Sequence, residues 1–555
     1  MSSLFSILNT GRQGILAQQV ALSVTSNNIA NVNTPGYSKE TADLESLVTG
    51  GVSVASVQRL NDDFLSGRLR NANAEYGASS TLATNLQSIE SALGDSTDTG
   101  LSTDLGNFFS ALQDLSQQPA DSANRESLRS SAQQLSTSFA SLSSQLGAIR
   151  GQLDDQVVQS VNQVNTLTSQ IAALNGQITN LGGTAAQAQH PEMNQMLDSR
   201  ALLLDQLSQI VPVKAVANPN GSMTVFVAGQ VLIDGARQQK LSTVVSQANG
   251  GCHEVVTQDC AGNNVSLDST LSSGTLGGLL QARDTYAKDA QDQADRISAQ
   301  LIQKFNIQHR AGTGLDGVSG RDFFSGLSAQ AMPAWNNKGG VSVGSATITD
   351  DTQLTFDDYE VRFTSAGQFN VVDTTSGNTV SSNNAYVPGG SIDIAGMRLV
   401  LNNGSGAPAA GDVIAINSYA GTAGRMDLSA AVKASTGAIA AGQTSAAGDN
   451  TNALKLADLG RLATMGQPPS QTFQATFDAA RLLVSTASQN AQSRETDSQT
   501  TQSQIQALAD SVSGVSVDEE TTNILQFQRG FQASSQLISV TDQLMQSLLT
   551  MMTNG

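Results

Sequence analysis

The sequence predicts a mainly α-helical, multidomain α+β protein in which β-rich domains are inserted into a long helical shaft. Three observations favour this fold class. Apolar residues recur every seven positions at both ends of the chain, and a longer repeat of this kind runs through residues 128–181. Short alternating segments separated by Gly, Asn and Asp occupy residues 211–275 and 340–425. A seven-residue repeat is typical of paired helices, whereas alternation is typical of strands.

The two termini are predicted to be helices that carry matching apolar stripes. The stripe residues are Leu8, Ile15, Leu22 and Ile29 near the N-terminus and Ile524, Phe531, Ile538, Met545 and Met552 near the C-terminus. Gly11 and Gly14 are weak points of the first helix, because glycine is a poor helix former. Two such helices can pair only if the intervening chain loops out and returns. This arrangement indicates an assembly subunit more than an enzyme, and the stripes are its candidate interface.

The predicted organisation is nested. Residues 1–70 together with 510–555 form a terminal helical polymerisation domain. Residues 71–335 together with 426–509 form the helical shaft, which carries a β-hairpin region at about 211–275, and residues 336–425 form an inserted β domain. The repeat within 128–181 predicts a helical hairpin or bundle about 40 Å or more in length. An ordinary bundle core and a separate coiled coil explain that repeat equally well.

The last helix is predicted to begin at Ser516, which forms a capping-box pattern with Glu519. Asp518, Glu519 and Glu520 also place negative charge at the positive end of the helix dipole. We therefore interpret the acidic triplet as a helix start and not as a metal site.

Composition excludes several classes of partner. The net charge of −19 and the pI near 4.4 argue against nucleic-acid binding, which requires a basic surface. The sequence contains no run of about 18 apolar residues, so no membrane-spanning helix is predicted. The first residues lack the basic region of a secretory signal. The chain is therefore expected to be cytoplasmic, or to be exported by a route that leaves its N-terminus uncut.

Residues that could hold a metal are few. Cys252 and Cys260 could close a local disulfide or remain free thiols, and the sequence leaves both open. His253 lies beside Cys252, but no second Cys/His pair completes a zinc site. Asp357 and Asp358 lack the twelve-residue acidic loop of a calcium site, so a solvated strand edge is the better interpretation. No metal or cofactor is predicted.

Motifs of catalysis are also weak. Residues 340–344 match the nucleophile-elbow pattern, but strands follow them where a helix is required. Residues 312–317 match the dinucleotide fingerprint, but they follow a helix and not a strand. His309 is expected to be a structural hydrogen-bonding residue near a helix end. The sequence therefore predicts that the protein is not an enzyme.

A polar segment and a tight turn follow the N-terminal stripe. Thr34–Tyr37 places Pro at the second and Gly at the third position, which is the chemistry of a type II turn. The run 26–38, SNNIANVNTPGYS, resembles the N-terminal signature of the bacterial flagellar rod, hook and hook-associated axial proteins. The motif residues are Asn28, Asn31, Thr34, Pro35, Gly36 and Tyr37. Residues 513–534 and internal stretches at 277–284, at 305–309 together with 322–324, and at 448–454 resemble the hook-associated members of this family.

The resemblance implies a structural subunit of the junction zone between the flagellar hook and filament. It implies an extracellular protein that is exported unfolded through the flagellar type III pathway without signal cleavage. The expected partners are further copies of the chain, the hook protein, a second junction protein, and an export chaperone that binds the C-terminal helix. The alternatives are a hook or distal-rod protein of the same family and, in a different class, a secreted coiled-coil adhesin or translocator.

Overall fold

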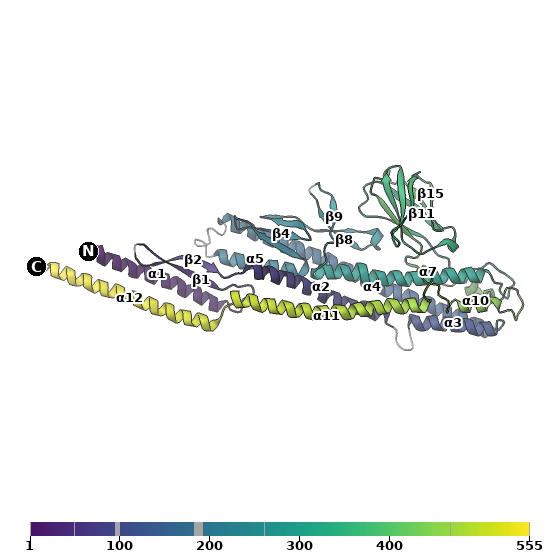
Figure 1. Ribbon diagram of the computed structural model, residues 1–555, viewed down its shortest axis with the longest axis horizontal. Helices are drawn as coiled ribbons and strands as arrows, with labels where there is room; N and C mark the ends of the chain where they lie inside the picture. The colour runs from purple at the N-terminus through teal and green to yellow at the C-terminus, as the bar shows by residue number, and fades with distance from the viewer. Residues whose placement is uncertain are drawn as a thin grey trace.

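The molecule is elongated, and both termini lie at the same end (Figure 1). The computed structural model describes residues 2–48, 50–94, 100–182, 192–259, 261–466 and 468–553. At the terminal end, α1 (Ser2–Ala30) and α12 (Val517–Thr553) run antiparallel beside each other. Long helices continue from this pair as a shaft, and β-sheets lie along one side of it. The predicted fold class is confirmed.

The shaft helices pack along heptad seams. The helix α4 (Ser122–Asn180) has 59 residues and is about 90 Å long at 1.5 Å per residue. Its predicted seam, which includes Leu128, Leu135, Phe139 and Leu146, is fully buried. The other long shaft helices are α2 (Asp63–Leu93), α3 (Leu101–Gln117), α5 (Glu192–Ile210), α7 (Lys288–Arg310) and α11 (Phe473–Ser513). Shorter helices are α6 (Gly274–Gln281), α8 (Thr422–Arg425), α9 (Ala430–Ala434) and α10 (Thr451–Asp458). A π-helical turn, η3 (Ala282–Ala287), joins α6 to α7 without a break.

Two groups of strands lie near the terminal half of the shaft. The hairpin of β1 (Glu40–Ser46) and β2 (Val52–Arg59) packs against α1. The predicted hairpin region forms two small antiparallel sheets beside α4. Their strands are β3 (Val213–Ala217), β4 (Met223–Val227), β5 (Gln230–Asp234) and β6 (Arg237–Gln238) in one sheet, and β7 (Ser242–Val245), β8 (His253–Gln258) and β9 (Asn264–Ser266) in the other.

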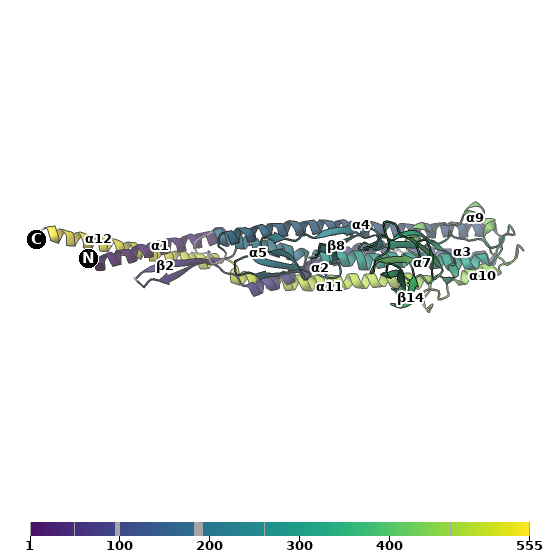
Figure 2. The same ribbon diagram turned by 90° about the horizontal axis from the view of Figure 1, so that it is seen from above.

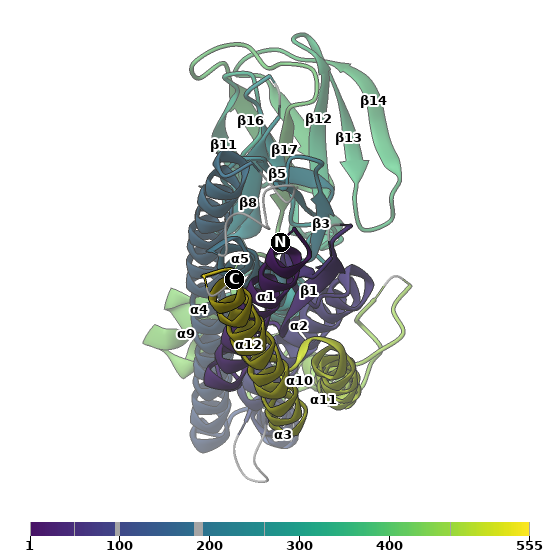
Figure 3. The same ribbon diagram turned by 90° about the vertical axis from the view of Figure 1, so that its left-hand side faces the viewer.

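The outer β domain projects from one side of the shaft (Figures 1 and 3), and in the view from above it lies over the shaft helices (Figure 2). Its sheets have the strand orders β10-β17-β12-β13-β14 and β11-β16-β15. The strands are β10 (Gln330–Pro333), β11 (Ser342–Ile348), β12 (Tyr359–Ser365), β13 (Gln368–Asp373), β14 (Thr379–Ala385), β15 (Ser391–Ile394), β16 (Met397–Asn402) and β17 (Val413–Asn417). The domain has its own apolar core around Val361, Leu399 and Ile414. Because β10 pairs with β17, we propose that this domain begins near residue 330.

Aromatic rings fill the end of the shaft that lies farthest from the termini. Phe305 lies 4.8 Å from Phe323 between ring centroids, and His309 lies 5.5 Å from Phe323. His309 is fully buried in the last turn of α7. Its Nδ1 lies 2.7 Å from the Arg321 carbonyl oxygen, and its Nε2 accepts a hydrogen bond from the Ala440 amide at 2.9 Å. The predicted structural role of His309 is confirmed.

Burial lowers the pKa of His309 from its ordinary value of 6.5 to about 4. The folded protein therefore favours the neutral ring. The contribution of this neutral ring to the free energy of unfolding is fully present above pH 6.5. It is lost as pH falls from about 6.5 toward 4, because the unfolded chain then binds the proton that the folded chain excludes.

We expect NMR titration to show that the His309 ring stays neutral down to about pH 4. The three histidine Cε1–H resonances would be followed between pH 8 and 3.5, with His309→Gln assigning the resonance that disappears. A His309 resonance that titrates near pH 6.5 would contradict the buried, neutral ring.

Candidate functional site at the terminal helices and their joint with the shaft

Glycines let the two terminal helices approach closely. A Cβ added to Gly11 would lie 2.8 Å from Ile538 Cγ1, and one added to Gly14 would lie 2.7 Å from Ser534 Oγ. On α12, a Cβ added to Gly530 would meet the Gln18 side chain at 2.9 Å. Real Cβ atoms do not fit at such distances without movement of their neighbours. Gly11 and Gly14, predicted as weak points of the helix, are therefore positions of close packing.

The predicted stripes lie along or beside this contact. Leu8, Ile15, Leu22 and Ile29 on α1 and Ile524, Phe531, Ile538 and Met545 on α12 are all partly buried. Met552 is 73% exposed. Because Gly11 lies opposite Ile538 and Gln18 opposite Gly530, the start of α1 is level with about residue 546, and the last turns of α12 extend beyond it (Figure 1). The assignment of these stripes to an assembly interface stays a prediction.

A second apolar stripe on α12 lies beside this contact and is exposed. It consists of Leu537, Val540, Leu544, Leu548 and Met551, and these side chains are 40–73% exposed. We call this set the open stripe. Sequence reasoning missed it, although Leu537, Leu544 and Met551 also recur every seven residues. On α1, Phe5, Leu16 and Val20 are exposed as well.

The motif turn joins α1 to the first β-hairpin. Gly36 has φ +79°, and the Tyr37 amide donates to the Thr34 carbonyl at 3.2 Å, as the predicted type II turn requires. Thr34 Oγ1 donates to Asn31 Oδ1 at 3.1 Å, and Pro35 occupies the second position of the turn. A Cβ on Gly36 would lie 3.0 Å from Leu202 Cβ of α5. Glycine is therefore required here both by its backbone angle and by this close contact.

Asn28 is the centre of the contacts below this turn. It is buried, and its Nδ2 donates to the Glu40 carbonyl at 2.9 Å and to Glu520 Oε2 at 3.1 Å. Its Oδ1 accepts from Tyr37 Oη at 2.8 Å and from the Glu40 amide at 2.9 Å. One side chain thus links α1, the motif turn, β1 and α12. We call Asn28, Tyr37, Lys39, Asp198 and Glu520 the joint.

Charges in the joint are paired. Lys39 Nζ lies 2.8 Å from Glu519 Oε1 and 3.5 Å from Glu520 Oε1, and its backbone amide donates to the Ser513 carbonyl at 2.7 Å. Burial lowers the pKa of Lys39, but the two carboxylates outweigh it and raise the pKa above its ordinary value. Burial and the neighbouring carboxylates raise the pKa of Tyr37, so its hydroxyl remains a donor at neutral pH. Glu520 is therefore a buried partner of Asn28 and Lys39, beyond its predicted role at the helix start.

Asp198 connects the joint to the shaft helix α5. Its Oδ2 accepts from the Ser38 amide at 3.1 Å, and its Oδ1 pairs with Arg59 Nη1 of β2 at 2.7 Å. The carboxylate thus holds the chain directly after the motif turn and the end of the hairpin. The sequence offered no signal for this contact, because Asp198 lies 160 residues from Ser38.

The other candidate sites have structural partners. Cys252 is buried, and Cys260 lies outside the described residues, so the pairing of the two cysteines stays open. His253 Nδ1 lies 2.6 Å from Asp154 Oδ2. Asp358 Oδ2 accepts from Arg296 at 2.7 Å. Within the described ranges, no group of three or more His, Cys, Asp or Glu side chains is placed to hold a metal ion.

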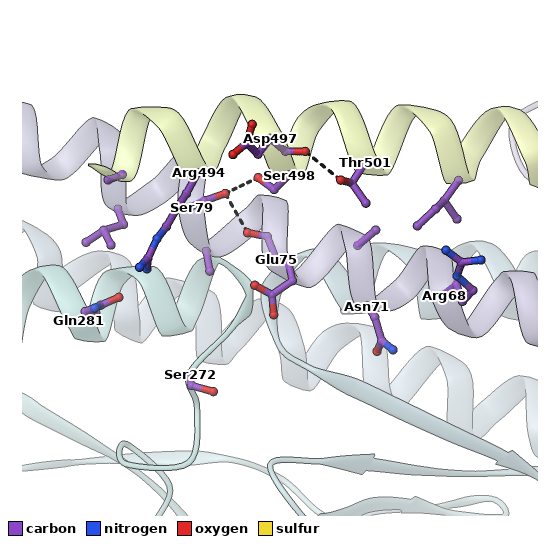
Figure 4. Close-up of a pocket in the computed structure, with 15 residues that line it drawn as sticks. Arg68, Asn71, Glu75, Ser79, Ser272, Gln281, Arg494, Asp497, Ser498 and Thr501 are labelled. Atoms are coloured by element: carbon purple, nitrogen blue, oxygen red, sulfur yellow. Dashed lines mark hydrogen bonds between the residues drawn. The ribbon is translucent and has the colours of Figure 1, made fainter. Parts of the chain in front are cut away.

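The glycine-rich motifs lie in loops and at strand starts. Residues 312–317 follow α7 and make tight turns, and residues 340–344 lead into β11. A groove of about 560 Å³ lies between α2 and α11 (Figure 4). Its walls are joined by a 2.6 Å contact between the Ser79 and Ser498 hydroxyls. No helix in the described part of the chain is long and apolar enough to cross a membrane.

Three family models match the chain. Residues 86–324 match the helical domain of the flagellar hook-associated protein FlgK. Residues 8–37 match the flagella basal body rod protein model, and residues 507–551 match the flagellar basal body rod FlgEFG protein C-terminal model.

Relatives match over nearly the whole chain. Flagellar hook-associated protein 1 of Escherichia coli strain K12 is 28% identical over 561 residues, covering 98% of this chain and 99% of its own. Flagellar hook-associated protein 1 of Bacillus subtilis strain 168 is 26% identical over 598 residues, covering 100% of both chains. The chain belongs to the flagellar hook-associated protein 1 family. It is therefore a structural component of the bacterial flagellum, and the resemblance seen in the sequence is confirmed.

A solved structure has the same fold. The flagellar hook junction protein FlgK from Burkholderia pseudomallei superposes with a TM-score of 0.69 at 22% identity, covering 80% of this chain and 100% of that chain. The family assignment also decides between the alternatives. The match of residues 86–324 to the FlgK helical domain separates this chain from a hook or distal-rod protein. The matches of both terminal segments to flagellar rod models favour an axial flagellar protein over an adhesin.

The joint connects the two segments that match rod-type models. Asn28 and Tyr37 lie in the matched N-terminal segment, and Glu520 lies in the matched C-terminal segment. The hydrogen bond from Asn28 to Glu520 thus ties these segments together at the end of the shaft. The part of this family that is shared with rod proteins is a single physical unit.

Replacing Asn28 with Ala should loosen this unit without unfolding the shaft. The substitution leaves Tyr37 Oη, the Glu40 backbone and Glu520 without their shared partner, at a cost of roughly 2–4 kcal/mol. Amide hydrogen exchange in the first turns of α12 should therefore accelerate at least about ten-fold. Exposed Asn27→Ala is the matched control. Equal protection of α12 in both variants would contradict the role of the joint.

Proposed function

We propose that this protein is a structural subunit of the junction zone between the flagellar hook and the filament. In this proposal it acts without catalysis and assembles through its terminal helices. Membership in the flagellar hook-associated protein 1 family supports the proposal, as does the similarity in fold to the flagellar hook junction protein FlgK from Burkholderia pseudomallei. The expected neighbours along the axis are further copies, the hook protein on one side and a second junction protein on the other.

The observation that carries the assembly mechanism is the open stripe on α12. A helix with one apolar face needs one partner, and α12 has two such faces. Gly11 and Gly14 of α1 contact the first face, through Ser534 and Ile538. The second face exposes Leu537, Val540, Leu544, Leu548 and Met551. A contiguous exposed apolar surface of this kind is typical of an interaction site.

We propose that α12 of a second copy covers this surface. In that arrangement, the predicted stripes Leu8 to Ile29 and Ile524 to Met545 hold each pair of terminal helices together, and the open stripe joins pairs from different subunits. Met552, which extends past α1, would be covered by a neighbour.

Before assembly, the same surface requires protection. The last turns of α12 expose Leu548, Leu549, Met551 and Met552. This apolar end fits the groove of a dedicated export chaperone, in the manner of an amphipathic helix in a groove. We propose that the chain leaves the cell through the flagellar type III pathway with its N-terminus uncut and functions outside the cell.

Leu544→Asp should block assembly and leave the monomer folded. Leu544 is half exposed in the monomer, so the charge costs little there, but it would be buried against a neighbour in the polymer at a cost of several kcal/mol. Motility would be measured in a deletion strain that carries the variant, and secreted protein would be measured in parallel. Gln543→Asp is the control on an exposed polar position. Wild-type motility with Leu544→Asp would contradict the role of the open stripe.

Ile538→Asp tests the other face. Ile538 contacts Gly11, so we expect this variant to loosen the α1–α12 pair in the monomer itself, which circular dichroism of the helices would detect. Leu544→Asp should not produce this change.

The proposed junction role has its own experiment. Deletion of the gene should leave hooks intact, remove filaments, and release flagellin into the medium, as seen by electron microscopy and immunoblotting. Normal filaments on the deletion strain would contradict the role at the junction, whatever the behaviour of the open stripe.

A further inference from the structure

The shaft helix α7 has two faces with different partners. Its apolar residues, including Ile297, Leu301 and Phe305, are fully buried in the core of the shaft. Another face carries Arg296, Gln303 and Arg310, which are spaced seven residues apart and therefore lie along one line of the helix. We call these three residues the α7 rail. All three donate hydrogen bonds to the outer β domain.

Arg296 makes the densest set of contacts. Its guanidinium donates to the Phe356 carbonyl, to Asp358 Oδ2 at 2.7 Å and to Tyr419 Oη at 2.9 Å. The guanidinium carbon lies 4.1 Å from the centroid of the Tyr419 ring, within the range of a cation–π contact. Tyr419 Oη in turn donates to Asp358 Oδ1 at 2.7 Å. Arg296 thus binds both the entrance to β12 and the chain that leaves the domain.

The other two rail residues hold one loop of the domain. Gln303 Nε2 donates to the carbonyls of Asp351 at 2.5 Å and Leu354 at 3.3 Å. Arg310 forms an ion pair with the Asp351 carboxylate. Between Arg296 and Gln303, Ala299 of α7 is fully buried in the apolar core of the outer domain. Residues 351–358 therefore lie along α7 and are held there by polar contacts with the rail, on either side of the small apolar residue Ala299.

The domain is attached to the shaft by a narrow neck. The chain enters the domain through β10 and leaves it through β17, and these two strands pair directly with each other. Below the neck, Asp295 accepts from the amides of Gly421 at 2.7 Å and Ala423 at 2.8 Å, which fixes the base of the exit. Two paired strands form a single pivot. They do not by themselves define the angle between the domain and the shaft.

A cleft lies beside this pivot. It has a volume of about 510 Å³ and is lined by both the domain and the loop that follows β7. Arg150, Asn249 and Gln291 line it on the shaft side, and Glu360 and Thr374 line it on the domain side. The cleft leaves room for the domain to tilt about the neck.

We infer that the α7 rail is a positioning device that sets the angle of the outer β domain against the shaft. The domain folds around its own core, and the rail holds it at one orientation. Loosening the rail lets the domain swing toward the cleft while both units stay folded. This inference concerns the single subunit and does not depend on assembly or on the proposed junction role.

Spin labels on the two units test this device in the full-length chain. Cysteines would replace exposed Ser169 on α4 and exposed Ser382 on β14, in a background with Cys252→Ser and Cys260→Ser. Double electron–electron resonance then measures the distance distribution between the labels. The unaltered rail should give one narrow peak. The triple variant Arg296→Ala, Gln303→Ala and Arg310→Ala should broaden the distribution on the order of two-fold.

Arg398→Ala is the matched control, because Arg398 forms a surface ion pair with Asp393 within the outer domain and does not touch the rail. It should keep the narrow peak. A narrow, unshifted peak for the triple variant would overturn the inference. Hydrogen exchange of β12, β13 and β17 provides the second readout. Lost protection of these strands in the triple variant, or in Arg296→Ala alone, would also overturn the inference. The rail would then stabilise the fold of the outer domain and not its orientation against the shaft.

Discussion

The arrangement of the terminal helices depends on a buried hydrogen bond between residues that are 492 positions apart. Asn28 donates to Glu520 at 3.1 Å, and both side chains are almost fully buried. A buried carboxylate is costly unless it is paired, and here Asn28 and Lys39 supply the pairing. Since Asn28 also binds the motif turn and β1, the bond fixes where α1 ends, where α12 begins, and the direction in which both leave the shaft.

The same seven-residue spacing serves three different purposes in this chain. In α4 it builds a fully buried seam of the shaft core. In α12 it appears twice, once toward α1 and once on the open stripe. In α7 it spaces three polar residues, Arg296, Gln303 and Arg310, along one line of the helix. These residues contact the outer domain through hydrogen bonds and an ion pair, where an apolar seam would contact another helix by packing. A single helix can thus present apolar residues to one neighbour and polar residues to another, because residues seven apart lie on the same face.

Much of the fold follows from the sequence because its determinants are local. The heptad of α4, the type II turn at Thr34–Tyr37 and the alternation of the outer strands depend on residues that are close in the chain. The joint could be predicted only in part. The motif marked Asn28 and Tyr37, but Glu520 and Asp198 are brought to them by the return of the chain, and no local pattern encodes that return.

Other features were missed for different physical reasons. The open stripe repeats every seven residues only at Leu537, Leu544 and Met551, whereas the stripe beside it repeats over the longer stretch from Ile524 to Met552. Met552 keeps the period of its stripe but lies beyond the end of α1 and cannot reach it. The α7 rail is polar, so a search for apolar periodicity does not detect it. Gly11 and Gly14 are unfavourable in an isolated helix, but the close approach of Ser534 and Ile538 requires them.

We propose that α12 keeps one face for its own chain and offers the other to a neighbour. Cysteine accessibility measures this directly. Leu544→Cys, in a background with Cys252→Ser and Cys260→Ser, would be labelled with a maleimide in purified monomer and in flagella detached from cells. We expect rapid labelling of the monomer and strong protection in the assembled flagellum. Equal labelling rates in the two states would contradict this proposal.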